Sequence, residues 1–389
     1  MKLGKCTKMF KKILTSFLIW RVALFLIAFL SIYFLPVFGA RFPYVDKVLE
    51  ITHLPYWVWG FGNFDGVHYL RIAQDGYLAQ YSQAFFPLFP LLIQFFSFVF
   101  PRVANLDTSF FTDPAFFYSG IILSNLFFLA ALYVLFKLIN IDFKKDTAFL
   151  TVVFLLVFPT SFFFGSVYTE SLFLLLMVSS IYFIRKRNFF WGAILIFLAT
   201  ATRITGVLLI PLYLIEVFQS RNKFNYIWTL VTPLGLLAYM YFLKITFNDS
   251  FYFLTAQPIF GAGRSGADLI LLPQVIYRYI KIFLTTNILT LPFFNALIEF
   301  VFTLISLTAL IVFFKKMRFS YWIFSVSALL LPTLTGTFSS MPRYVLMSVV
   351  LLFPYLITRF RKYVRPAILA SALLGILLTV FFVRGYWIA

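Results

Sequence analysis

The chain has 389 residues, of which 62% are hydrophobic and only 12% are charged, and its formal net charge is +19. Soluble globular chains have about 45–50% apolar and about 25% charged residues, so this composition excludes a water-soluble globular fold. One cysteine and two histidines exclude a disulfide framework and a Cys/His metal cluster. The basic residues fall in short clusters between apolar runs, a pattern typical of membrane topology rather than of nucleic-acid binding.

Long apolar runs along the chain can cross a hydrocarbon core of about 30 Å as helices. With no linker or convincing internal repeat, they predict a single domain, residues 1–389, that is an all-α polytopic membrane bundle of about eleven transmembrane helices. The first run follows a basic N-terminus and is too long for a cleaved signal peptide, which favours a retained signal anchor. The predicted spans are 13–36, 116–139, 146–164, 168–184, 189–202, 205–219, 225–244, 288–314, 320–338, 344–358 and 367–384.

Two further apolar segments do not fit the alternation of the spans. Segment 85–100 contains Pro87 and Pro90, which suits a broken, re-entrant or in-plane helix. Segment 269–286 carries Arg278 and Lys281 within an apolar sequence and is better interpreted as an interfacial helix.

The lysine and arginine clusters set the orientation. With the N-terminus in the cytoplasm, 20 of the 32 basic residues face the cytoplasm, and the two long loops, 37–84 and 245–287, lie outside. The sequence therefore predicts a multi-pass protein, of the cell membrane in a prokaryote, with its site on the non-cytoplasmic face. The clusters are Lys2, Lys5, Lys8, Lys11 and Lys12; Lys137, Lys144 and Lys145; Arg185, Lys186 and Arg187; Arg221 and Lys223; Lys315, Lys316 and Arg318; and Arg359, Arg361, Lys362 and Arg365.

The first outer loop combines interface aromatic residues with Asp65, His68, Arg71 and Asp75. On a helix, Asp65, His68 and Arg71 follow one another at intervals of three residues, so all three can share a face. The alternative is a solvated loop with a few interface anchors.

Three charges lie near predicted outer turns: Glu170, Arg203 and Arg343. The spans on either side of Arg203 are each only about 21 to 23 Å long, so its turn is expected below the outer surface. A charge at that depth costs roughly 2.5–3.5 kcal/mol and usually faces a partner or a cavity. A structural pair of Arg203 with Glu170 is one interpretation. The other is a site where two arginines bind the phosphate of a lipid beside a carboxylate.

A sugar carried on a polyprenyl phosphate fits this second interpretation. A carboxylate in the outer loop can take the proton of an acceptor hydroxyl that attacks the anomeric carbon, while cations stabilise the departing phosphate. A transporter or flippase of a lipid-linked sugar is the alternative, although such proteins often show inverted repeats and charges near the midplane.

Several segments resemble the PIG-V (GPI mannosyltransferase II) family of the GT-C class of membrane glycosyltransferases. In chain order they are FDGVHYLRIAQDGY followed by AFFPLFPLL, then FPTSFFFGSVYTESLF, ATRITGVLLIP, FYFLTAQPIF and SSMPRYVLMSVVLLFPYL. The first two are specific in combination. The family usually has Trp before the first-loop Asp, whereas this chain has Phe64, which keeps an aromatic wall but loses an indole donor.

The resemblance implies inverting transfer of mannose, or a similar hexose, from a polyprenyl or dolichyl phosphate donor to an envelope glycolipid or glycoprotein. It implies Asp65 as the catalytic base and no cofactor. A divalent cation held by Asp65 with Asp75 or Glu170 is an alternative that the resemblance does not favour. The remaining implied roles are donor phosphate binding by Arg203, Arg343 and Arg71, and substrate binding by His68, Tyr69, Glu170 and Gln257.

Overall fold

A computed structural model gives the fold of residues 2–41, 44–220, 222–261, 263–266 and 268–388. In this part of the chain the regular structure is helical and no β-strand occurs, which confirms the predicted all-α class. Arg221, a member of one basic cluster, lies outside the described residues.

The chain forms two compact units, each assembled from separate stretches of sequence. Unit 1 comprises Met1–Ser82, Pro87–Tyr182 and Ile357–Trp387, and unit 2 comprises Gln83–Phe86, Phe183–Leu356 and Ile388–Ala389. Outer loop 37–84 therefore falls almost wholly in unit 1 and loop 245–287 in unit 2. The assignment of the whole chain to one domain stays a prediction.

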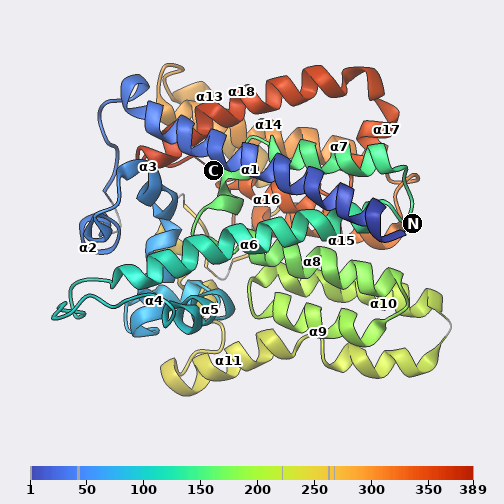
Figure 1. Ribbon diagram of the computed structural model, residues 1–389, viewed down its shortest axis with the longest axis horizontal. Coiled ribbons are helices and arrows are strands. Elements are labelled where there is room, and N and C mark those ends of the chain that lie inside the picture. Colours follow the sequence, from blue (N-terminus) through green and yellow to red (C-terminus); the bar gives the residue numbers. More distant parts are fainter. Residues whose placement is uncertain (1, 42–43, 221, 262, 267, 389) are drawn as a thin grey trace. The chain divides into compact units, whose positions relative to one another are not determined.

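Unit 1 is built on three long helices, α1 (Lys2–Phe34), α6 (Pro114–Ile139) and α18 (Val364–Val383), and α1 packs against both of the others (Figure 1). Helix α8 (Glu170–Arg185) begins in this unit. Its shorter helices are α2 (Val45–Val48), η1 (Glu50–Thr52), α3 (Tyr56–Trp59), η2 (Gly60–Gly62), α4 (Asp65–Asp75), α5 (Leu88–Ser97), α7 (Lys145–Leu156), η4 (Ser161–Gly165) and η9 (Arg361–Tyr363).

Unit 2 is organised around α14 (Leu291–Val312), α15 (Phe319–Leu330) and α16 (Met341–Ser348), which all pack against one another. Helix α15 also packs against α10. The other helices of unit 2 are α9 (Phe189–Thr200), η5 (Ile204–Leu208), α10 (Leu209–Ser220), η6 (Lys223–Leu230), α11 (Leu234–Phe247), α12 (Tyr252–Thr255), η7 (Gln257–Phe260), α13 (Leu272–Thr285) and η8 (Leu331–Leu334); η3 (Ser82–Ala84) and α17 (Phe353–Arg359) lie at the junctions.

Each predicted span corresponds to helical structure, but the predicted number of eleven exceeds what helix length supports. Five helical segments of the described residues are long and apolar enough to cross a membrane, and a pair bent by 78°, Met341–Ser348 with Phe353–Arg359, makes a sixth if it counts as one span. Some predicted spans divide into shorter helices. Segment 146–164, for example, consists of α7 and the short 3-10 helix η4, and Pro159 lies between the two helices. The five segments are Lys8–Phe34, Pro114–Ile139, Phe224–Phe247, Leu291–Val312 and Arg361–Val383.

Segments 85–100 and 269–286 contain the short helices α5 and α13, and their re-entrant or interfacial placement stays a prediction. Helix α5 begins after Pro87 and has 10 residues, and α13 has 14. At about 1.5 Å per residue, both are shorter than a hydrocarbon core. Arg278 of α13 donates from Nη1 to the carbonyl oxygens of Gly263 and Gly336, both at 3.0 Å.

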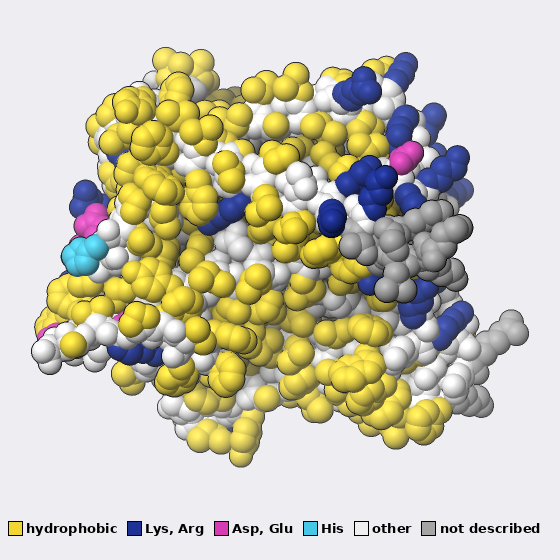
Figure 2. Space-filling model, viewed as in Figure 1, with side chains coloured by type: hydrophobic (Ala, Val, Ile, Leu, Met, Phe, Trp, Pro, Cys, Tyr) yellow, Lys and Arg dark blue, Asp and Glu magenta, His cyan; other side chains and the backbone are white. Residues whose placement is uncertain are grey.

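The surface of unit 1 suits a lipid environment. The outward faces of α1 and α18 are largely hydrophobic, and hydrophobic side chains cover most of the face drawn in Figure 2. Such large apolar surfaces are typical of contact with lipid or a partner rather than water. Their exposed members include Ile19, Val22, Leu26, Leu369 and Leu373.

Unit 1 has two chemically different ends. Lys8, Lys11 and Lys12 of α1 lie at the same end as Lys137 in the last turn of α6, because the Phe10 and Tyr133 ring centroids are 5.4 Å apart. Farther along α1, Phe25 contacts Phe61 at 5.7 Å, just before α4 begins. Loop 37–84 therefore lies at the end of unit 1 away from these basic residues (Figure 1).

Candidate active site

Asp65 is the first residue of α4, and the chain before it is tightly held. The Asn63 side chain donates from Nδ2 to the carbonyl oxygens of Phe382 and Val383 at 3.0 and 3.3 Å, and the Tyr168 hydroxyl donates to the Asn63 carbonyl at 2.8 Å. Phe64 has a φ of 59°, which non-glycine residues rarely adopt. Strain of this kind persists only where neighbours fix the backbone, and it is common at functional sites.

The aromatic wall expected at Phe64 is present. Its ring packs against Trp387 at 5.0 Å and Phe382 at 5.8 Å between ring centroids. The residue in the place of the family's usual Trp therefore keeps an aromatic surface beside Asp65.

Helix α4 is amphipathic, and its polar residues share one face. Asp65, His68 and Arg71 are half-buried, whereas the opposite face packs into unit 1 through Gly66, Val67, Leu70 and Ala73 among others. The structure thus confirms that Asp65, His68 and Arg71 share a helix face. Burial lowers the pKa of His68 below its usual value, and the Asp65 carboxylate opposes this shift with a smaller effect. The imidazole is therefore neutral near pH 7.

Glu170 begins α8 within the same part of unit 1 and is only 1% exposed. A Cβ on Gly66 would lie 3.3 Å from the carbonyl oxygen of Val167, so the start of α4 packs directly on the segment that leads to Glu170. Tyr69, predicted to bind substrate, is buried, with its hydroxyl 3.5 Å from Thr169 Oγ1 and its ring 5.5 Å from that of Phe89. Tyr69 therefore helps to join α4 to the core.

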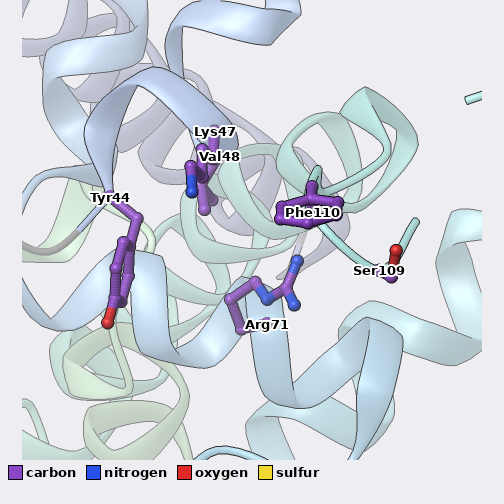
Figure 3. A pocket seen from close by; sticks show the side chains of 6 residues that line it. All are labelled: Tyr44, Lys47, Val48, Arg71, Ser109 and Phe110. Carbon is purple, nitrogen blue, oxygen red and sulfur yellow. The ribbon is translucent and has the colours of Figure 1, made fainter. Parts of the chain in front are cut away.

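Arg71 lines a pocket of about 150 Å³ on unit 1, with Tyr44, Lys47, Val48, Ser109 and Phe110 (Figure 3). Its Nη2 atom pairs with Asp75 Oδ2 at 2.8 Å. The guanidinium is thus already partly neutralised by a carboxylate of its own helix.

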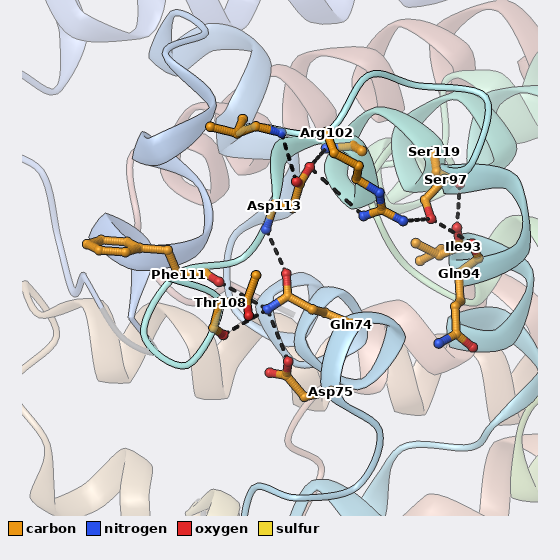
Figure 4. A network of polar contacts seen from close by, with 12 residues as sticks. Gln74, Asp75, Ile93, Gln94, Ser97, Arg102, Thr108, Phe111, Asp113 and Ser119 are labelled. Carbon is orange, nitrogen blue, oxygen red and sulfur yellow. Dashed lines mark hydrogen bonds and ion pairs between the residues drawn. The ribbon is translucent and has the colours of Figure 1, made fainter. Parts of the chain in front are cut away.

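The C-terminal end of α4 is fixed by a polar network around Gln74 (Figure 4). Gln74 Oε1 accepts from the Asp113 N–H at 2.7 Å, and its Nε2 donates to Asp75 Oδ1 and to the carbonyl oxygens of Thr108 and Phe111. The Asp113 carboxylate in turn caps α6 by accepting from the Ala115 N–H at 2.8 Å. The network joins α4 to the start of α6.

In unit 2, Arg203 and Arg343 both contact the ring of Tyr344. The guanidinium carbon of each lies 5.6 Å from the centroid of the Tyr344 ring. Arg203 precedes η5, and Arg343 lies in the first turn of α16 and is 8% exposed. Two guanidinium groups near one ring form a site suited to a multiply charged anion, because their planar forks donate bidentately to phosphate.

A buried carboxylate holds the turn that carries Arg343. Ser340, in the left-handed region with φ 67°, donates its N–H to Glu299 Oε1 at 3.3 Å. Tyr279 donates its hydroxyl to Glu299 Oε2 at 2.5 Å and accepts from the Phe338 N–H at 3.1 Å. The start of α16 is thus set by groups from α13 and α14.

Comparison with known protein families identifies the chain at this point. A sequence model described as Mannosyltransferase (PIG-V) matches residues 45–242, just over half of the chain. The chain belongs to the mannosyltransferase (PIG-V) family. No curated protein matches it. The resemblance noted in the sequence is confirmed, and the protein is a membrane mannosyltransferase.

The family model covers part of unit 1 and part of unit 2. The matched range contains Asp65, Glu170 and Arg203 but ends before Gln257 and Arg343. Arg343 is tied to the PIG-V region by its shared contact with Tyr344. Gln257 donates from Nε2 to the Phe253 carbonyl at 3.0 Å, so the structure gives it a local role, and its substrate role stays a prediction.

Sequence reasoning missed Glu299, Tyr279 and Tyr344. Glu299 is the sole acid in the predicted span 288–314, and an acid inside an apolar span is itself a functional signal. No comparable signal marks Tyr279, because aromatic residues are abundant throughout this chain, whereas Tyr344 directly follows Arg343 in one of the segments that resemble the PIG-V family.

A divalent cation was the alternative partner for Asp65 with Asp75 or Glu170. Among the described residues, no three His, Cys, Asp or Glu side chains are grouped as a metal site requires. The Asp75 carboxylate is bound by Arg71 and Gln74, so a cation there would have to displace both.

Lowering the pH should destabilise this PIG-V protein through His68. The folded state keeps the imidazole neutral below about 6.5, whereas the unfolded chain takes up a proton there. Stability therefore falls as the pH drops below about 6.5, by at most about 1.4 kcal/mol per pH unit. Thermal unfolding at pH 7.5 and 5.0 should show a smaller loss for His68→Gln than for wild type. The exposed His53 supplies the control, His53→Gln; an equal loss in all three proteins would contradict the assignment.

Removing the Glu299 carboxylate should loosen the turn at Ser340. Glu299→Ala leaves the buried Tyr279 hydroxyl and the Ser340 N–H without their acceptor, which should lower the free energy of unfolding by about 1–3 kcal/mol. Glu299→Gln keeps an acceptor oxygen and should lose less. Thermal unfolding of the purified variants measures this, and equal stability of Glu299→Ala and wild type would exclude the role.

Proposed function

We propose that this PIG-V family member transfers mannose, or a similar hexose, from a polyprenyl or dolichyl phosphate donor to an envelope glycolipid or glycoprotein on the non-cytoplasmic face. The observation that carries the proposal is that the guanidinium groups of Arg203 and Arg343 both lie 5.6 Å from the centroid of the Tyr344 ring. In a mannosyltransferase family, such a pair indicates a donor whose leaving group is a phosphate.

Asp65 of unit 1 is assigned the role of general base. It accepts the proton of the acceptor hydroxyl as that oxygen attacks the anomeric carbon of the sugar. The bond from this carbon to the phosphate oxygen breaks, and the polyprenyl phosphate leaves with the bonding electrons. Attack from the face opposite the leaving group inverts the anomeric configuration. The position of Asp65 on the half-buried polar face of α4 and the constrained backbone before it support this role.

Arg203 and Arg343 of unit 2 are assigned to the donor phosphate. As the glycosidic bond breaks, negative charge grows on the phosphate, and fixed cations stabilise it more in the transition state than in the bound substrate. The Glu299 and Tyr279 network keeps the Arg343 turn in place before the donor arrives. Arg71, which pairs with Asp75, is a weaker candidate for binding the donor phosphate.

Glu170 and His68 complete the proposed site in unit 1. The transition state carries positive charge on the sugar ring, so a buried carboxylate such as Glu170 stabilises it electrostatically. Neutral His68 can donate to or accept from a sugar hydroxyl. Gln257 stays a candidate for the sugar or the acceptor.

Different observations support the lipid-linked donor and the placement of the site on the non-cytoplasmic face. The apolar helices give a polyprenyl chain a compatible environment. In unit 1 the basic end and the α4 end are distinct (Figure 1), and basic clusters are typical of the cytoplasmic side. A site at the α4 end therefore favours the non-cytoplasmic face.

Donor choice tests the proposal. The protein reconstituted in liposomes is given mannose-labelled polyprenyl phosphate mannose, or in a parallel sample labelled GDP-mannose, together with a membrane lipid and protein extract. We expect label in an acceptor only from the polyprenyl donor. Transfer from GDP-mannose alone, in the absence of any polyprenyl donor, would overturn the assignment of the donor class.

A further inference from the structure

A second, strongly basic pocket lies on unit 1, where η9 leads into α18. It has a volume of about 410 Å³ and is lined by Leu150 of α7 and by Arg361, Lys362, Val364, Arg365 and Ile368. It lies at the basic end of unit 1, because α7 begins at Lys145 just after the basic turn that follows α6. The proposed transfer chemistry uses none of these residues.

The three cations of this pocket form no ion pair with the acidic residues that the structure describes. Arg361, Lys362 and Arg365 are all exposed. The Lys362 ammonium lies over the Tyr363 ring, 4.7 Å from its centroid. Three neighbouring cations repel one another, and an anion bound among them relieves that repulsion.

An exposed apolar stripe continues from the pocket along α18. Leu369, Leu373 and Leu377 follow Arg365 at successive intervals of four residues, which places them on one helix face. They are 62%, 59% and 41% exposed. The segment Arg361–Val383 is a candidate membrane span, so this stripe faces the lipid chains when the helix crosses the bilayer.

We propose that this pocket binds the headgroup of an anionic phospholipid. The phosphate contacts Arg361, Lys362 and Arg365, and an acyl chain lies along Leu369, Leu373 and Leu377. Charge complementarity selects the headgroup, since basic pockets beside membrane helices bind anionic lipids. The apolar stripe favours a lipid over a free phosphate, because a free phosphate has no acyl chain to pack against these leucines. A lipid held there links α7 to α18 and stabilises the folded state.

Lipid-dependent thermal stability tests this site independently of any transferase activity. The full-length protein, purified in a neutral detergent, is titrated with phosphatidylglycerol or with phosphatidylcholine while its unfolding midpoint is measured. We expect phosphatidylglycerol to raise the midpoint and phosphatidylcholine to have no comparable effect. The double variant Arg361→Gln/Arg365→Gln should need roughly tenfold or more phosphatidylglycerol for the same rise, since each basic residue near an anionic surface contributes appreciably.

A control variant with the same change of charge at another place distinguishes lipid binding in this pocket from general attraction of anionic lipid to a basic surface. Lys315→Gln/Lys316→Gln removes the same charge from another basic cluster and should leave the phosphatidylglycerol response unchanged. Leu373→Ser, which keeps all cations, should weaken the response through the acyl chain. An unchanged response in Arg361→Gln/Arg365→Gln, or equal losses in both double variants, would overturn the proposal. So would a full midpoint rise from inorganic phosphate or glycerol phosphate, because the site would then take a free phosphate.

Discussion

Replacing Asp65 with asparagine should reduce mannosyl transfer by about 10²- to 10⁴-fold, the contribution typical of a positioned general base. Asparagine keeps the size and the hydrogen-bonding reach of the side chain but cannot take the acceptor's proton. The loss should therefore appear in kcat rather than in the donor concentration needed for half-maximal rate. Initial rates with labelled polyprenyl phosphate mannose measure the change.

Helix α4 supplies a matched control for Asp65. Asp75 ends the same helix, and its carboxylate pairs with Arg71 at 2.8 Å. Asp75→Asn removes the same charge and should retain most of the turnover. Unfolding midpoints of both variants should stay near that of wild type. Near wild-type turnover in Asp65→Asn, with the fold intact, would remove Asp65 from the role of base.

Truncating either arginine at Tyr344 should weaken use of the donor. Hydrogen bonds to charged groups contribute about 1.5–3 kcal/mol, so Arg203→Ala or Arg343→Ala should lower kcat/KM for the donor about ten- to hundredfold. The acceptor concentration for half-maximal rate should change little. Initial rates measured against both substrates separate the two effects.

Two conservative variants refine this second prediction. Arg343→Lys keeps the charge but loses the planar fork and should recover only part of the donor affinity. Tyr344→Phe keeps the ring that both guanidinium groups contact and should stay near wild type. An unchanged donor dependence in both arginine-to-alanine variants would contradict a phosphate contact.

The fold class followed from the sequence, and the lengths of the helices did not. Hydropathy marks where apolar residues run, so every predicted span contains helix. It does not mark where an apolar chain turns. Segment 344–358 consists of two helices at 78°, and Phe319–Leu334 changes from α to 3-10 helix at Leu331, just before Pro332. Where a helix breaks inside the protein, the residues at the break are still apolar. Composition alone therefore does not reveal the break.

The candidate site was predictable where the pattern is local. Intervals of three residues were enough to place Asp65, His68 and Arg71 on one helix face, because helical geometry fixes that relation. Contacts between distant segments were not predictable in the same way. Nothing near Asn63 in the sequence indicates its bonds to Phe382 and Val383, and nothing near Ser340 indicates Glu299.

Tyr69 and Arg71 show a further limit of sequence reasoning. Both belong to the motif that resembles the PIG-V family, yet Tyr69 faces the core and Arg71 pairs with Asp75. A motif residue can thus have a packing or pairing role as well, and the substrate roles of Tyr69 and Arg71 stay predictions. Spacing alone does not show which residues of the helix are buried in the folded chain.

The most direct test of the central claim follows two labels on one donor. Polyprenyl phosphate mannose carries tritium in the sugar and ³²P in the phosphate, and the purified protein in liposomes is supplied with a membrane extract as acceptor. Sugar transfer predicts that tritium enters the acceptor while an equal amount of ³²P stays with the polyprenyl lipid, and that both changes stop in Asp65→Asn. Movement of the intact donor across the bilayer, with the two labels never separating, would contradict the transferase and favour a transporter.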